Sequence, residues 1–190
     1  MDLNLPRLAV LVSSLVFVHH LHASEPSSAA ATQADPLIAQ GKYVAQLGDC
    51  IACHTAKDGA VMAGGLELTT PMGTLYSSNI TPDPETGIGR YTFEQFDRAM
   101  RQGVTPAGDN LYPAMPYPSY AKMSESDMRA LYACLMQGVS PVKQANLQAD
   151  MSWPFNQRWG LWFWNKLFVD DAPFGADPAK DPQVSRGAYL

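Results

Sequence analysis

Residues 50–54 read Cys-Ile-Ala-Cys-His, and this pentapeptide constrains the chain more than any other feature. Two cysteines three residues apart lie one helical turn apart, so each can form a thioether to one of the two vinyl groups of a single haem. The histidine that follows can give the iron an imidazole nitrogen. The spacing is typical of covalent c-type haem attachment. We therefore predict one haem c, bound through Cys50 and Cys53, with His54 as an axial iron ligand.

Two other interpretations of the motif are a redox-active Cys-x-x-Cys and half of a zinc site. Tetrahedral zinc needs four separated ligands, yet beyond the motif the chain offers only Cys134 and three histidines near its start, His19, His20 and His22. A thioredoxin-like motif follows a strand in a βαβ unit, and no such pattern is present. Cys134 itself is interpreted as a buried thiol, with a reactive or intermolecular thiol as the alternative.

The first residues have the pattern of a secretory signal. An apolar run at residues 8–18 follows Arg7 and precedes Ser/Ala-rich sequence. We predict a signal peptide at residues 1–23 and a disordered linker at 24–34. Export agrees with the haem motif, because haem is attached to c-type cytochromes outside the cytoplasm, and it predicts a periplasmic protein. With a net charge of −5 and no basic stripe, nucleic acid is not expected as a partner.

Three helices are predicted after the linker. The first begins at Asp35-Pro36, an N-cap followed by proline at the first helical position, and ends near Gly48. Its apolar stripe is expected to comprise Leu37, Val44 and Leu47, with Tyr43 beside them. Gly41 in its middle suggests that another helix crosses closely.

The second helix runs from Thr92, in a capping box with Gln95, to Gly103, and the third from Ser124 to Gly138. The residues expected to face the core are Phe93, Phe96, Met100, Met128, Leu131, Tyr132, Leu135 and Met136.

Between the first two helices, residues 57–91 are rich in Gly, Pro, Thr and Asn and show no helical period. Residues 66–70 and 74–78 are predicted to form a short hairpin. So long a loop is usually functional or disordered, and we expect this one to wrap the edge of the haem. Arg90 could pair with a haem propionate through its fork of donors, and Asn79 could donate to the same group. Exposed loop residues without that role are the alternative for both.

The sixth iron ligand must come from another side chain or remain open, because His54 would be the only histidine of the mature chain. A methionine thioether favours ferrous iron. Met115 lies among three prolines at residues 112–118, where no regular helix can form, and such a stiff loop suits a ligand. Met72 is the second candidate, and a methionine that only fills a gap is the alternative.

Residues 153–168 contain all four tryptophans of the chain. This segment is too short to cross a bilayer. It is expected either to pack against its own haem domain or to dock on a neighbouring haem domain, a dehydrogenase or the membrane surface.

Three stretches carry a family resemblance: residues 50–55, residues 70–96 and residues 111–120, the last reading Leu-Tyr-Pro-Ala-Met-Pro-Tyr-Pro-Ser-Tyr. They resemble the first haem domain of the three-haem cytochrome c subunit of bacterial membrane-bound alcohol, gluconate, aldehyde and related dehydrogenases. The resemblance runs from about Gly41 to the end of the chain. It implies that Cys50, Cys53, His54 and Met115 bind the haem.

The resemblance also implies an all-α, class I cytochrome c domain with long haem-wrapping loops, here followed by the Trp-rich C-terminal extension. The implied function is to pass electrons from a dehydrogenase catalytic subunit towards ubiquinone or a terminal oxidase, without being an enzyme by itself. The complex would associate with the inner membrane. Two alternatives are a single-haem, diffusible periplasmic carrier and a haem enzyme or gas sensor with an open sixth site. The absence of a distal histidine disfavours a peroxidase-like enzyme.

The expected domain organisation is a haem domain at residues 35–140, the Trp-rich extension at 141–184 and the start of a second haem domain at 185–190. The last assignment depends on Gly187-Ala-Tyr-Leu190, which resembles Gly41-Lys-Tyr-Val44. We therefore expect a subunit that is cut before the cysteines of its second domain.

Overall fold

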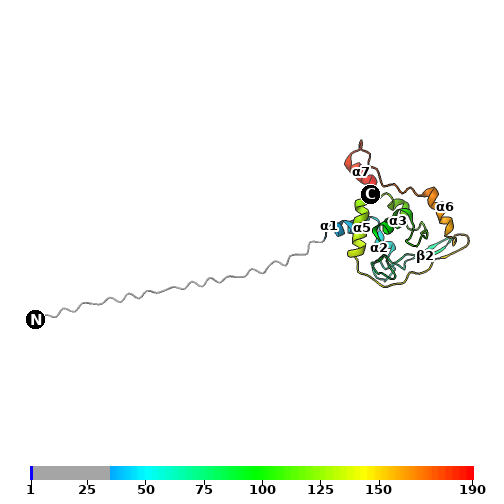
Figure 1. Cartoon of the computed structure of the whole chain (residues 1–190), viewed down its shortest axis with the longest axis horizontal. Helices are drawn as coiled ribbons and strands as arrows, with labels where there is room; N and C mark the ends of the chain where they lie inside the picture. Colours follow the sequence, from blue (N-terminus) through cyan, green and yellow to red (C-terminus); the bar gives the residue numbers. More distant parts are fainter. Residues whose placement is uncertain (2–34) are drawn as a thin grey trace. The chain divides into compact units, whose positions relative to one another are not determined.

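The computed structural model describes Met1 and residues 35–190, so the predicted signal peptide and linker lie outside the described residues apart from Met1. Residues 35–190 belong to one compact unit. Its helices and strands, most of which are labelled in Figure 1, are α1 (Pro36–Leu47), α2 (Cys50–Cys53), β1 (Glu67–Thr70), β2 (Gly73–Tyr76), α3 (Phe93–Gln102), α4 (Tyr117–Tyr120), α5 (Glu125–Gln137), β3 (Asp150–Met151), α6 (Trp159–Phe168) and α7 (Pro182–Tyr189).

Helix α1 begins as predicted, but it buries a different face. The Asp35 side chain accepts a hydrogen bond from the Leu37 amide at 2.8 Å, and Pro36 occupies the first turn. The buried residues are Gly41, Val44 and Ala45. The predicted stripe was wrong for its larger members, because Leu37, Tyr43 and Leu47 are 43%, 46% and 47% exposed. Small residues face the core because a second helix approaches α1 too closely for large side chains.

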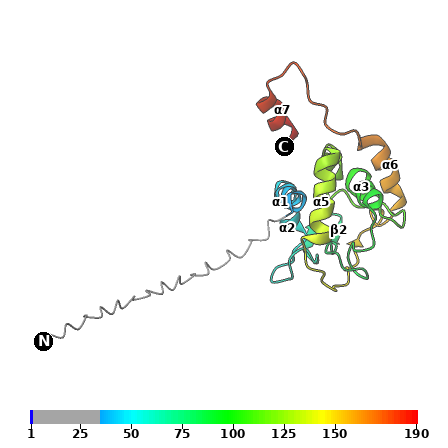
Figure 2. The ribbon, with the colours of Figure 1, turned by 60° about the vertical axis from the view of Figure 1, so that its left-hand side comes forward.

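That second helix is α5, which lies beside α1 in both ribbon views (Figures 1 and 2). A Cβ atom on Gly41 would overlap the carbonyl oxygen of Ala130 and the side chain of Cys134, both on α5. The predicted close crossing at Gly41 is therefore confirmed. The crossing packs α1, whose C-cap Gly48 precedes the Cys-x-x-Cys-His motif, against α5.

We expect Gly41→Ala to destabilise the protein by about 1–3 kcal/mol or more, because the added methyl group meets backbone that cannot move aside. Urea-induced unfolding of the purified protein measures this. The control is Gly160→Ala in α6, where nothing lies within 4 Å of the added atom and alanine should stabilise the helix by up to about 1 kcal/mol. An unchanged midpoint for Gly41→Ala would contradict the close crossing.

Helices α3 and α5 also begin where the sequence predicted. The Thr92 hydroxyl accepts from the Gln95 amide and the Gln95 side chain accepts from the Thr92 amide, which completes the capping box. Ser124 caps α5 by accepting from the Asp127 amide. Gly103 ends α3 in the left-handed conformation at φ 64°. The core formed with α1 consists mainly of Val44, Phe96, Met100, Met128, Leu131 and Leu135.

The predicted hairpin is present in the long loop, with Thr70 paired to Gly73 across a two-residue connection. A third strand was not predicted: β3 adds antiparallel to β2, with Met151 opposite Gly73. A two-residue strand has no periodicity that a sequence could show. Strand β3 ties the beginning of the C-terminal extension to the hairpin.

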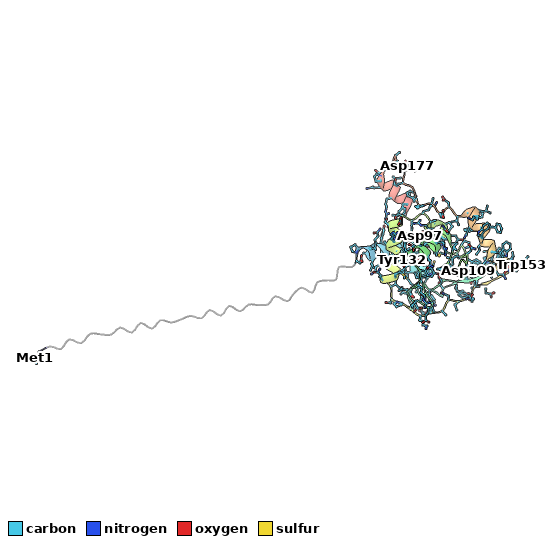
Figure 3. The ribbon with its side chains drawn as sticks, viewed as in Figure 1. Met1, Asp97, Asp109, Tyr132, Trp153 and Asp177 are labelled. Atoms are coloured by element: carbon cyan, nitrogen blue, oxygen red, sulfur yellow. The ribbon has the colours of Figure 1, made fainter. Side chains whose placement is uncertain are left out.

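The Trp-rich segment packs against the haem domain along one edge. Trp164 makes an edge-on contact with Tyr117, with ring centroids 5.9 Å apart. The Asn165 side-chain amide donates to the carbonyl oxygen of Gln102 at the end of α3, and Figure 2 shows α6 beside α3. Other rings of the segment face outwards. Trp153, at the periphery in Figure 3, is 79% exposed. Within residues 35–190, no helix has the length and apolar character to traverse a bilayer.

Candidate functional site

The Cys-x-x-Cys pair forms the single-turn helix α2, which follows directly on α1. Cys50 is buried, Cys53 is exposed, and both line the same cavity. Burial raises the pKa of the Cys50 thiol to about 11. This thiol is therefore neutral at pH 7, and neutral thiols react slowly in exchange and metal binding.

His54 follows α2 and lines the same cavity. Its Nδ1 atom lies 2.7 Å from the Ser78 carbonyl oxygen. A carbonyl only accepts, so Nδ1 carries the proton and Nε2 keeps a free lone pair. Burial lowers the pKa of His54, and the hydrogen bond to Ser78 partly opposes that shift. The imidazole is therefore neutral at pH 7, the form in which it ligates a metal, and its ring orientation is fixed by the backbone of the long loop.

The cavity has a volume of about 340 Å³, within the range of roughly 300–1,000 Å³ found for cofactor sites. It brings Cys50, Cys53, His54 and Met115 together. Apolar side chains from several elements complete the lining, among them Leu75, Ile88, Phe96, Leu131 and Leu135. Two thiols, an imidazole lone pair, a thioether and an apolar surround are the groups that bind haem c, so the residues present fit this cofactor.

Met115 reaches the cavity from the proline-rich stretch at residues 112–118. The expectation that no regular helix forms there was wrong at its end, because the single-turn helix α4 begins at Tyr117, and its first turn tolerates Pro118. Its amide donates to the Tyr112 carbonyl oxygen and its own carbonyl accepts from the Tyr117 amide at 2.8 Å. Met72 is 39% exposed at the hairpin turn and does not line the cavity. Met100 does line it, from the buried face of α3. The cavity thus holds two thioethers, of which Met115 is the one carried by a loop.

Two tyrosines hold the Met115 loop in place. Tyr117 is fully buried, and its hydroxyl group donates to Asn165 Oδ1 at 2.7 Å. The Tyr120 hydroxyl donates to the Gly48 carbonyl oxygen, also at 2.7 Å, just before the cysteine motif. Burial raises the pKa of both phenols to about 12, so both remain hydrogen-bond donors at neutral pH. The loop that carries Met115 and the turn that carries Cys50 are therefore directly connected.

Neither of the two residues predicted to contact a propionate belongs to the cavity lining. Arg90 is exposed and is not part of the lining. Asn79 is buried, with its side-chain amide donating to Thr86 and to the carbonyl oxygens of Val142 and Gln144. Its side-chain oxygen accepts from the amide and the hydroxyl group of Thr81. Asn79 thus joins the long loop to the C-terminal extension, and the propionate role of both residues stays a prediction without support from their positions.

Several residues of the site carry no local signal in the sequence. The Ser78 carbonyl is a backbone group and leaves no signal in a sequence. Tyr120 directly follows the proline-rich stretch, but its partner Gly48 is 72 residues away. Arg158 also lines the cavity, and a single basic residue in an aromatic segment gave no reason to place it there.

The alternatives for the motif find no counterpart in the described structure. The motif follows a helix, and the only sheet among residues 35–190 is a small antiparallel one. Over the same range, no three His, Cys, Asp or Glu side chains are grouped so that they could hold a metal ion. Cys134 is a buried free thiol whose pKa is raised by burial, which agrees with its interpretation as a core residue.

Comparison with known proteins agrees with this geometry. Residues 38–138 match the family model described as cytochrome c. The cytochrome c subunit of alcohol dehydrogenase (quinone) from Gluconacetobacter polyoxogenes is 54% identical over 155 residues, covering 81% of this chain and 33% of that protein. The gluconate 2-dehydrogenase cytochrome c subunit of Pantoea cypripedii is 52% identical over 157 residues, covering 82% of this chain and 36% of that protein.

A third relative is the fructose dehydrogenase cytochrome subunit of Gluconobacter japonicus. It is 40% identical over 169 residues, covering 88% of this chain and 34% of that protein. The chain thus spans about a third of the length of these curated relatives.

Proposed function

Since this chain belongs to the cytochrome c family, we propose that it transfers electrons through one covalently bound haem c, with His54 and Met115 as axial ligands. One observation carries the proposal: a single apolar cavity is lined by both cysteines of the motif, the histidine and a loop methionine. The motif and the methionine come from separate parts of the chain and line one cavity, as the residues of a common ligand site would.

The residues that line the cavity have different roles in binding the haem and in setting its reduction potential. Haem c, when bound, supplies an iron that accepts and gives up one electron. Cys50 and Cys53 would anchor the cofactor, and His54 Nε2 would donate to the iron, with the Ser78 carbonyl fixing the orientation of the imidazole ring. The thioether of Met115 is soft and neutral and favours the ferrous state. The apolar lining would keep water away from the bound haem and so limit the reorganisation that accompanies electron transfer.

We propose a dehydrogenase catalytic subunit as the electron donor. The relatives are named as cytochrome subunits of alcohol, gluconate and fructose dehydrogenases, which supports this class of partner. Ubiquinone or a terminal oxidase would be the downstream acceptor. The protein would work on the periplasmic side and associate with the inner membrane through its complex, and it would carry out no substrate chemistry by itself.

We also propose that residues 185–190 begin a second haem domain. Asp181 and Pro182 start α7 as Asp35 and Pro36 start α1, and in both helices the Asp side chain accepts from the amide two residues on. Gly187 stands at the same distance from its cap as Gly41. The repeat of cap, proline and glycine supports a repeat of the domain.

Potentiometric and spectroscopic titration of protein produced with the c-type maturation machinery tests the function. An electron carrier should show one reversible one-electron transition and low-spin spectra that carbon monoxide leaves unchanged. A high-spin protein that binds carbon monoxide or turns over peroxide would support a haem enzyme or gas sensor instead. Rapid haem reduction by an alcohol or gluconate dehydrogenase catalytic subunit and its substrate would support the proposed donor, and reduction by dithionite alone would count against it.

A further inference from the structure

The cavity lining contains a single formally charged side chain. Among the described residues that line it, no Asp, Glu or Lys is present, His54 is neutral, and Arg158 is the only cation. Haem c carries two propionate carboxylates, and a carboxylate near an apolar cavity needs a positive partner or strong hydrogen-bond donors. The charge of the lining therefore complements the one charged part of this cofactor.

Arg158 stands at the edge of the cavity, where such a carboxylate can stay partly hydrated. Its side chain is exposed, and its guanidinium carbon lies 5.1 Å from the centroid of the Tyr112 ring. The guanidinium donates to the Asn110 carbonyl oxygen at 3.4 Å. No carboxylate among residues 35–190 forms an ion pair with it. Most of its five donors thus remain available for an anion, and stacking on Tyr112 limits its rotamers.

The segment that carries Arg158 is fixed to the haem domain on both sides. On one side β3 pairs with β2, and the Tyr112 hydroxyl donates to the Phe155 carbonyl oxygen at 3.1 Å. On the other side, Asn165 bonds Tyr117 and the side chain of Asn110. Arg158 is therefore held in position before any ligand binds, which reduces the entropic cost of recruiting it.

We propose that Arg158 binds a haem propionate, so that the Trp-rich segment beyond the matched cytochrome c region forms part of the haem site. This inference rests on the proposed haem function. The positive partner of the propionate would then lie outside residues 38–138. The packing of α6 against the Met115 loop would help to position this partner beside the cofactor.

Two other arginines are weaker candidates. Arg90 does not line the cavity. Arg98 has a buried Nε without a hydrogen-bond partner in the described structure, but its Nη2 atom donates to the Thr105 carbonyl oxygen and the residue is not part of the lining either.

The test is the reduction potential of holoprotein carrying Arg158→Gln, with Arg90→Gln and Lys166→Gln as matched controls. Lys166 is a cation on α6 that does not line the cavity. Arg158→Gln should lower the potential, because removal of a cation beside a propionate favours the ferric state, which carries one more positive charge. The difference should shrink as ionic strength rises, since Arg158 is exposed. The two controls should leave the potential close to that of the wild type, and Arg158→Lys should retain part of the effect.

An unchanged potential in Arg158→Gln, or a drop confined to Arg90→Gln, would overturn the proposal. A merely structural role through Tyr112 would lower the unfolding midpoint of the holoprotein and leave its reduction potential unchanged, which would also count against the proposal. The wild-type spectrum with and without carbon monoxide tests the haem function separately. A carbon-monoxide-binding wild type would refute His54/Met115 ligation, whereas the difference in potential between wild type and variant would still report on Arg158.

Discussion

Met115→Ala is expected to change a low-spin haem protein that does not bind carbon monoxide into one that binds it readily. Alanine cannot ligate iron, and the loop of residues 112–118 is too constrained by its prolines to bring in another side chain. The reduction potential should fall as well, because the soft thioether that favours ferrous iron is lost. Absorption spectra of both oxidation states, before and after carbon monoxide, measure the change.

Two other methionines provide the controls for this experiment. Met72→Ala removes an exposed thioether that does not line the cavity, so its spectra should match those of the wild type. Met100→Leu removes the other thioether that lines the cavity and keeps the volume of the side chain. If Met100→Leu made the haem bind carbon monoxide and Met115→Ala did not, the sixth ligand would be Met100 and our assignment would be wrong.

The double substitution Cys50→Ala/Cys53→Ala is expected to abolish covalent haem attachment. Both thiols line the cavity and have no disulfide partner, so each is available for a thioether. Haem staining after denaturing electrophoresis should show no signal for the double variant. The protein should also lose stability, because the apolar cavity lining would then lack its covalently held ligand.

Cys134→Ala is the matched control, since it removes the third cysteine, which does not line this cavity. The Cys134→Ala variant should keep haem staining at the wild-type level, and its only expected defect is weaker packing of the core around residue 134. Covalent haem that persists in the double variant, or that disappears in Cys134→Ala, would refute the assignment of the thioether positions.

The sequence by itself determined the features that depend on nearby residues. Helix ends followed from caps that act over two or three positions, such as Asp35 with Pro36 and Thr92 with Gln95. The haem motif and the proline-rich methionine loop are likewise local, so their chemistry could be stated before any fold was known. The cytochrome c family and the mainly helical fold class, inferred by resemblance from residues 50–55, 70–96 and 111–120, are confirmed by the comparisons.

The tertiary structure alone decided which distant groups meet. The buried face of α1 depended on how closely α5 crosses at Gly41, so the larger apolar residues of α1 face solvent. Strand β3, the Ser78 carbonyl at His54 and Arg158 at the cavity edge each join segments that lie far apart in the chain. Caps and turns are local because their hydrogen bonds close within one helical turn, whereas the site is assembled by packing, which depends on the shapes of all elements together.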